Sequence, residues 1–377
     1  MAKLVNEGRS ELTATIQQHW DLCLQCRACE AVCPSGVPYG RIQEHARAQL
    51  QASPPSGRLG RRIRRFVLRN VIARPRVLGA AMAPARWYSG SVVRRTVRLT
   101  RVLRLVPRLG AMERSLPWRV GPPVRQEDLP ADAPGETVSL LTGCVMGELF
   151  GDAHRATVRV LERSGYTVIA PPEQGCCGAL HAHDGDLWYA RKLARKNIDA
   201  FEGSEPIVVN SAGCGAAMKE YGDLLAHDKD YAGKAAAFAA RVRDFSEVVA
   251  EVKNRPAARS NARVTYQDAC HLVHAQRIRE QPRALLREVS GCELIETAGA
   301  DVCCGAAGIY SLVQPEMSAE LRRMKAEQFA TARPDIIVTG NPGCQLQYTA
   351  AVAEAGLKSR VLHLAEFLDE AQAKAGG

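Results

Sequence analysis

The sequence of 377 residues has no apolar run near the ~20 residues needed to span a bilayer. Its opening, MAKLVNEGRSEL, is polar and lacks the apolar core of a signal peptide. Together these absences predict a cytoplasmic protein. No G-x-G-x-x-G fingerprint follows a predicted strand, so we expect neither flavin nor NAD, no substrate pocket and no catalytic residue on this chain.

Acidic residues and lysines are missing from one long stretch. From His45 to Met112 the chain has 16 Arg, no Lys and no Asp or Glu. The remainder has 34 basic and 40 acidic residues, so this one segment accounts for the net charge of +10. Because the positive charge is local, overall basicity is poor evidence for nucleic-acid binding, and we predict none.

The arginine-rich segment contains two amphipathic patterns. Residues 61–72 and 92–106 each place apolar side chains on one helical face, namely Ile63, Phe66, Val67 and Val71 in the first and Leu99, Val102, Leu103 and Val106 in the second. Basic amphipathic helices can lie on anionic membrane surfaces. Residues 58–108 therefore form either a peripheral contact with the inner face of the membrane, or packed helices whose basic side faces solvent or a partner.

The 13 cysteines are numerous for a cytoplasmic chain, where disulfides do not persist, so they indicate metal ligands. Four of them, Cys23, Cys26, Cys29 and Cys33, precede Pro34 in the pattern C-x2-C-x2-C-x3-C-P. Bacterial ferredoxins hold a 4Fe–4S cluster with this spacing, and in two-cluster ferredoxins the fourth cysteine serves the other cluster. No second run of this kind exists in the chain.

The C-terminal two thirds contain an internal repeat. The strand-like runs VSLLTGC, YTVIAPPEQGCCG and PIVVNSAGC return as ARVTYQDAC, ELIETAGADVCCG and DIIVTGNPGC. The first cysteine and the CC pair are separated by 31 residues in the first copy and 32 in the second. The CC pair and the last cysteine are separated by 36 and 39 residues. The candidate ligands are Cys144, Cys176, Cys177 and Cys214 in the first copy, and Cys270, Cys303, Cys304 and Cys344 in the second.

Short strands that alternate with longer helical patterns predict parallel β-α-β units. Each predicted cysteine follows the carboxyl end of a strand, where open α/β sheets bind ligands, so each copy gathers four thiols at one edge. Four thiolates suit zinc or an iron–sulfur cluster. Because His271 lies beside Cys270 and could be a ligand, zinc remains an alternative to an iron–sulfur cluster. His274 is expected to be an ordinary helix residue. Cys292 aligns with Tyr166 and is not expected to be a ligand.

The two copies resemble the cysteine-rich CCG domain of heterodisulfide reductase and of iron–sulfur subunits of flavin dehydrogenases. The motifs DLCLQCRACEAVCPSGVPYG, CCGALHAHDGD and NPGCQLQ resemble the glycolate oxidase (glycolate dehydrogenase) iron–sulfur subunit. The resemblance implies an α/β protein with an N-terminal α-helical ferredoxin-type domain. The expected divisions are residues 1–50 for that domain, 51–131 for a basic helical connector, and 132–256 and 257–377 for the two CCG repeats.

The resemblance also implies at least one 4Fe–4S cluster on the N-terminal cysteines and further clusters in the repeats. A partner FAD-binding 2-hydroxy-acid dehydrogenase is expected to supply electrons, which this chain would pass toward quinone. Subunits of D-lactate and glycerol-3-phosphate dehydrogenases share the architecture and remain alternatives. A zinc-stabilised binding scaffold with one ferredoxin cluster is the rival class.

Two departures from the family pattern matter. Each repeat lacks the C-x-x-C that ends the fuller CCG pattern, because GAA follows Cys214 and QLQ follows Cys344. Each copy thus offers four cysteines rather than five, which leaves open whether each half binds a cluster. The opening MAKLVNEGRSELTATIQQHW resembles the helix that joins two ferredoxin motifs in relatives. We therefore expect a first motif to be encoded upstream.

Overall fold

Two parallel four-stranded sheets form the centre of the computed structural model, which describes residues 1–100, 110, 113–114, 116–117, 120–129 and 135–376. The first sheet has the order β2-β1-β3-β4 and the second has the order β6-β5-β7-β8, so the same topology occurs twice. The predicted α/β fold with two repeated domains is therefore confirmed. The strands are β1 (Glu136–Leu140), β2 (Tyr166–Ile169), β3 (Ile207–Val209), β4 (Val242–Asp244), β5 (Arg263–Tyr266), β6 (Glu293–Leu294), β7 (Ile336–Thr339) and β8 (Arg360–His363).

Helices connect the strands of each sheet because a parallel pair needs a crossover. The α10 and α17 helices end shortly before Gly165 and Gly291, whose φ angles of 91° and 77° turn the chain into the next strand. The first repeat contains α9 (Val145–Leu149), α10 (Gly151–Arg163), α11 (Ala179–His183), α12 (Leu187–Ala200), α13 (Ala212–Lys219), α14 (Tyr221–Leu224), α15 (Ala232–Arg241) and α16 (Phe245–Glu251). The second contains the π-helix η4 (His271–Ala275), α17 (Glu280–Arg287), α18 (Tyr310–Val313), α19 (Pro315–Ala332), α20 (Pro342–Glu354) and α21 (Leu364–Ala375).

The two repeats share one hydrophobic core. Val138 and Val168 of the first sheet belong to the same buried cluster as Val264 and Val338 of the second. At its edge α10 packs on α21, where Asp369 accepts hydrogen bonds from two arginines of α10. The repeats are therefore packed as one body rather than as separate domains on a linker.

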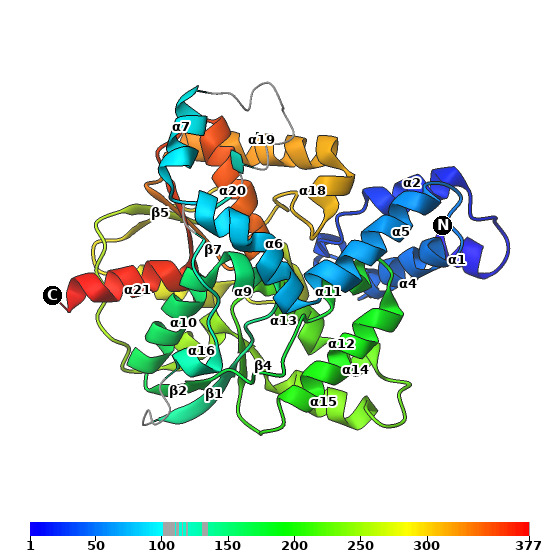
Figure 1. The fold of residues 1–377 in the computed structure, drawn as a ribbon, viewed down its shortest axis with the longest axis horizontal. Coiled ribbons are helices and arrows are strands. Elements are labelled where there is room, and N and C mark those ends of the chain that lie inside the picture. The colour runs from blue at the N-terminus through cyan, green and yellow to red at the C-terminus, as the bar shows by residue number, and fades with distance from the viewer. Residues whose placement is uncertain (101–109, 111–112, 115, 118–119, 130–134, 377) are drawn as a thin grey trace.

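The N-terminal helices form a lobe at one side of the repeats, coloured blue in Figure 1. They are α1 (Ala2–Asn6), α2 (Ala14–Leu22), α3 (Ala28–Ala31) and α4 (Tyr39–Ala52). Trp20, Ala46 and Leu50 form the small core of this lobe. The lobe is held to the first repeat by the side chain of Arg47, which donates to the carbonyl of His183 at 2.8 Å.

The arginine-rich connector crosses the front of the molecule in the view of Figure 1. It contains α5 (Arg58–Val67), the π-helix η1 (Leu68–Ile72), α6 (Pro75–Tyr88), α7 (Val92–Thr100) and, further on, the 3-10 helix η3 (Gln126–Asp128). The predicted stripe positions 102, 103 and 106 lie outside the described residues. In the described part of the chain, every helix is too short or too polar to cross a membrane.

Candidate metal centres

The N-terminal cysteines lie between α2 and α4, with Cys29 inside the short helix α3. Gln25 and Arg27 adopt left-handed φ angles of 54° and 64°, which bend the chain around the cysteines. The backbone N–H of Gln25 lies 3.4 Å from the sulfur of Cys23. Burial raises the pKa of Cys26, as do the neighbouring sulfurs of Cys270 and Cys23.

Two further cysteines complete this motif. Burial raises the pKa of Cys29, with a further contribution from the sulfurs of Cys26 and Cys23, so these three cysteines are close neighbours. The pKa of Cys33 is instead lowered, chiefly by the backbone N–H groups of Val37 and Ser35. The fourth cysteine therefore has a different environment from the other three.

In the first repeat, the four predicted cysteines come together past the carboxyl ends of β1, β2 and β3. The sulfurs of Cys144 and Cys176 are 3.5 Å apart, and Cys177 hydrogen-bonds to both Cys176 and Cys214. The hydrogen bonds from Cys144 and Cys177 lower the pKa of Cys176. The backbone N–H of Gly178 also lies 3.5 Å from that sulfur, so Cys176 is the favoured site of negative charge.

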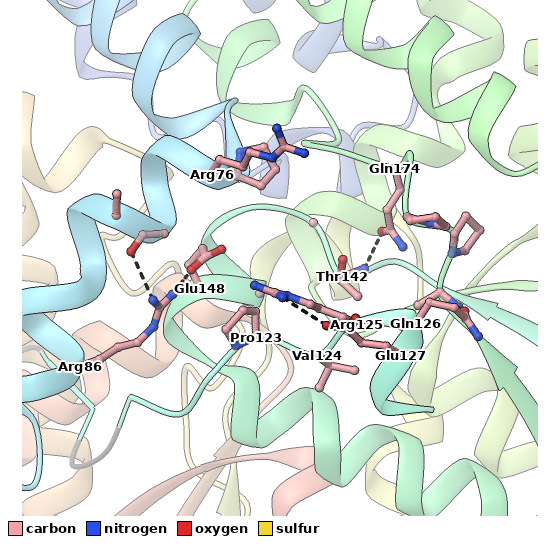
Figure 2. Close-up of a pocket in the computed structure, with 18 residues that line it drawn as sticks. Arg76, Arg86, Pro123, Val124, Arg125, Gln126, Glu127, Thr142, Glu148 and Gln174 are labelled. Carbon is pink, nitrogen blue, oxygen red and sulfur yellow. Dashed lines mark hydrogen bonds and ion pairs between the residues drawn. The ribbon is translucent and has the colours of Figure 1, made fainter. Parts of the chain in front are cut away.

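Two buried amide side chains fix the loops of this first set. Gln174 accepts from the Thr142 N–H at 2.7 Å and donates to the Leu140 carbonyl at 3.0 Å, which ties the end of β1 to the vicinal cysteines (Figure 2). Asn197 accepts from the Gly175 N–H at 2.9 Å and donates to the Cys176 carbonyl at 3.0 Å. The backbone that presents the sulfurs is thus held from two directions.

The second repeat repeats the arrangement. The sulfurs of Cys304 and Cys344 are 3.3 Å apart, and Cys303 hydrogen-bonds to Cys270 and Cys304. The amide of Asn341 lies 3.5 Å from the sulfur of Cys344. The structure therefore brings together all four predicted cysteines in each copy.

Cys292, which was predicted not to be a ligand, lies half-buried against the shared core, at the start of β6. The pKa of its thiol is raised by burial. It thus occupies the packing position expected from its alignment with Tyr166, itself packed against the same core.

The second set differs from the first in having a buried ammonium beside it. Lys325 is 1% exposed and donates to the side chain of Gln267 at 2.9 Å and to the carbonyl of Gly299 at 2.8 Å. Burial lowers its pKa, while the sulfurs of Cys304 and Cys344 raise it. Lys325 could not be singled out from the sequence, because α19 carries several other charged side chains that are exposed.

The two histidines near Cys270 have different roles. His274 shares a hydrogen bond with the carbonyl of Asp301 at 3.1 Å, as expected for an ordinary polar residue. The His271 ring stacks on that of His183 with the centroids 5.1 Å apart, and burial lowers its pKa to about 3. This stack places the second repeat against α11, the helix that follows the vicinal cysteines of the first.

The N-terminal motif lies next to the second repeat. Besides the proximity of Cys26 to Cys270, the hydroxyl of Tyr310 donates to the Leu22 carbonyl at 3.0 Å. The pKa of Tyr310 is raised by burial and by the sulfurs of Cys23 and Cys303, so its side chain is close to both sets of cysteines. Sequence reasoning missed this contact because its partners are almost 300 residues apart.

A cavity of about 710 Å³ opens beside the first set, between α6 and the loops after β1 and β2 (Figure 2). Thr142 and Gly143 line it, so it reaches the residue before Cys144. Two of its arginines are paired, since Arg86 binds Glu148 and Arg125 binds Glu127. None of the predicted cysteine ligands lines this cavity.

The donor sets fit a group bound by thiolates. Within the described ranges, no three His, Cys, Asp or Glu side chains are arranged to hold a metal ion. In each repeat one pair of sulfurs, Cys144 with Cys176 and Cys304 with Cys344, instead lies within hydrogen-bond distance, as neutral thiols do. Four soft sulfurs per repeat, with N–H donors beside them, are the donor chemistry of iron–sulfur clusters or zinc.

The repeated sheets and their vicinal cysteines define a cysteine-rich protein of the CCG class, and the CCG cysteine-rich domain matches residues 138–219 and 264–349. The linker region of the glycolate oxidase iron-sulfur subunit matches residues 59–116. The chain belongs to the glycolate oxidase iron–sulfur subunit family, as the resemblance predicted.

Three relatives illustrate the similarity. The probable glycolate oxidase iron-sulfur subunit of Bacillus subtilis is 36% identical, and the match covers 98% of this chain and 86% of the relative. The glycolate oxidase iron-sulfur subunit of Escherichia coli is 33% identical over 99% of this chain and 87% of its own length. Lactate utilization protein A of Oceanobacillus iheyensis is 30% identical over 62% of this chain and 96% of that protein.

Proposed function

We propose that this chain is the electron-transfer subunit of a glycolate-oxidising complex. The observation that carries the proposal is the gathering of two four-cysteine sets, each with three buried members, at corresponding sheet edges, with a ferredoxin-type motif against the second. Thiolate-held iron–sulfur clusters supply one-electron chemistry when bound. The chain's own part is to place the sulfurs, exclude water and offer N–H donors that tune the negative charge.

The proposed ligands follow the three sets. Cys23, Cys26, Cys29 and Cys33 would hold a 4Fe–4S cluster, with residues 1–50 as its domain and residues 51–131 as the connector. Residues 132–256 and 257–377 would form the two cysteine-rich repeats. Their proposed ligands are Cys144, Cys176, Cys177, Cys214, Cys270, Cys303, Cys304 and Cys344.

The position of Tyr310 supports a short path between two of the sets. Its buried ring lies near both Cys23 and Cys303, and Cys26 lies near Cys270. Electron transfer needs its centres held at a fixed separation in a dry environment. A buried aromatic side chain close to both sets would help to keep water away from them.

The proposal includes partners on either side of this chain. A FAD-binding 2-hydroxy-acid dehydrogenase would oxidise glycolate and donate the electrons, which would leave for quinone. The protein would be cytoplasmic and would contact the inner face of the membrane through residues 58–108. The two relatives named as glycolate oxidase subunits support glycolate, and the relative named lactate utilization protein A supports lactate as the second candidate.

The test is metal analysis of protein purified without oxygen, together with the proteins that copurify. Iron and sulfide well above about four per chain would support clusters in the repeats as well as in the N-terminal motif. Zinc together with about four iron atoms would favour the binding scaffold instead. Recovery of a FAD-binding dehydrogenase under mild conditions would support the complex.

A matched pair of variants assigns the ligands. Cys304→Ser replaces a soft thiolate with a poorly ionised hydroxyl, so iron content should fall. Cys292→Ser changes a half-buried cysteine that packs against the shared core, so iron content should stay unchanged. Equal iron loss in both variants would show that the second set is assigned wrongly.

A further inference from the structure

The α5 helix lies on the protein with Arg61 and Arg64 inward and its apolar side outward. Leu59, Ile63 and Phe66, one or two turns apart, are 71%, 56% and 64% exposed. On the opposite side Arg61 is only 6% exposed and Leu68 only 1%. This orientation reverses the usual packing of a surface amphipathic helix, which turns its apolar face toward the core.

Ion pairs with distant acidic residues fix this orientation. Arg61 pairs with Asp21 of the N-terminal lobe, and Arg64 lies 2.6 Å from Asp184 of the first repeat. Just past α5, the guanidinium of Arg69 donates two hydrogen bonds of 2.6 Å to Asp186.

Both aspartates of the first repeat are buried, and they directly follow the helix after its vicinal cysteines. Turning α5 over would take Arg64 away from the buried Asp184 and Arg61 away from Asp21, and the loss of a charged partner from a buried carboxylate is unfavourable. The helix is therefore held with its apolar face outward.

The exposed stripe has basic and aromatic neighbours. Arg58 and Arg62 are exposed along one flank of the helix. Trp188 is 61% exposed, with Arg69 5.2 Å and Lys192 5.9 Å from its ring. Clustered exposed apolar residues mark interaction sites, Trp is enriched at the lipid–water boundary, and Lys and Arg are common on the polar face of helices that lie there.

The geometry points to an anionic lipid bilayer as the occupant of this face. The apolar stripe of α5 would enter the boundary between headgroups and acyl chains, while Arg58 and Arg62 would meet lipid phosphates. The positive charge of the connector favours an anionic bilayer, because no acidic residue occurs from His45 to Met112. The inference rests on the proposed function, since a lipid-soluble acceptor gives the protein a reason to approach the bilayer.

The experiment is cosedimentation of the whole chain with vesicles of equal parts phosphatidylglycerol and phosphatidylcholine. The parent protein should bind these vesicles and should not bind pure phosphatidylcholine. The Ile63→Ser/Phe66→Ser variant should bind at least about tenfold more weakly, because it loses two apolar side chains. Arg58→Gln/Arg62→Gln should bind severalfold more weakly and depend less on salt.

Met324 of α19 provides the matched control, since it is an apolar residue that is 40% exposed outside the connector. Met324→Ser should bind like the parent, and unchanged thermal unfolding would show that each variant is folded. Failure of the parent to bind anionic vesicles would overturn the inference, as would equal binding by the Ile63→Ser/Phe66→Ser variant. If that variant instead lost only its flavoprotein partner, the face would be a protein interface.

This outcome is separable from the proposed function. The vesicle assay needs no catalytic turnover, so a chain that reduces quinone without binding vesicles would refute only the docking face. A chain that binds vesicles but contains no iron would refute only the electron-transfer role.

Discussion

The pair formed by Arg283 and Asp268 offers a sharp test of how the second cysteine set is held. Asp268 follows β5, two residues before Cys270, and its side chain is fully buried. Arg283 of α17 donates two hydrogen bonds to it, of 2.9 and 2.7 Å. Its Nε–H group also donates to Glu296 at 2.9 Å, and its Nη1 group donates to the carbonyl of Arg279 at 3.0 Å. The perturbation is Arg283→Met, which keeps an unbranched apolar stem and removes every donor.

The size of the effect follows from the carboxylate that stays behind. Removing one partner of a buried ion pair typically costs about 3–5 kcal/mol, because the other charge remains buried without compensation. Arg283 and Asp268 are 4% and 1% exposed, so water cannot replace the lost donors. We therefore expect the free energy of unfolding to fall by about 3 kcal/mol or more. Adding Asp268→Leu should restore part of this loss, because the unpaired charge disappears.

The assay is chemical denaturation with linear extrapolation, in parallel with iron content. Arg323→Met is the matched control, because Arg323 also pairs with two glutamates but its side chain and theirs are more than half exposed. That variant should unfold almost like the parent. A decrease below about 1 kcal/mol for Arg283→Met would refute the reasoning, because a buried pair costs more than that when broken. So would an equal effect of the two variants.

Two further predictions concern buried titratable groups. Burial lowers the pKa of His154 to about 4, so the unfolded chain binds a proton that the folded chain does not; stability should fall as the pH drops from about 6.5 toward 4. His154→Gln should reduce this dependence of the free energy of unfolding on pH, measured by denaturation at pH 7.5 and 5. The exposed His227 is the control, and its substitution should leave the dependence unchanged. An unchanged dependence in His154→Gln would contradict the assignment. Lys325→Gln removes a positive charge beside the second set and should lower its midpoint potential by roughly 50 mV. Redox titration monitored by electron paramagnetic resonance measures this shift, with Lys374→Gln on α21 as the control; equal potentials in the two variants would exclude the electrostatic role.

The repeated fold and the two cysteine sets could be predicted because their determinants are local. Each strand is a short apolar run that ends before a cysteine, and parallel strands bring such positions to one edge. The orientation of α5 could not be predicted in this way. Its pattern gave the two faces, but the acidic partners that choose between them, Asp21, Asp184 and Asp186, come from other parts of the chain.

Other features were hidden for the same physical reason. The burial of Lys325 depends on carbonyl groups of a loop more than 20 residues earlier in the sequence. The proximity of Cys26 to Cys270 depends on how the N-terminal lobe packs on the second repeat. A single-sequence pattern carries period and spacing, and neither quantity specifies such long-range contacts.

Because Val138 and Val264 lie in one core, the two repeats depend on each other for their stability. Neither half retains its own complete interior, so cutting the chain between them would uncover apolar surface on both products. The two repeats should therefore fold, unfold and be degraded together, although their sequences still resemble two copies of one unit. A substitution in this shared core should therefore disturb the packing of both repeats.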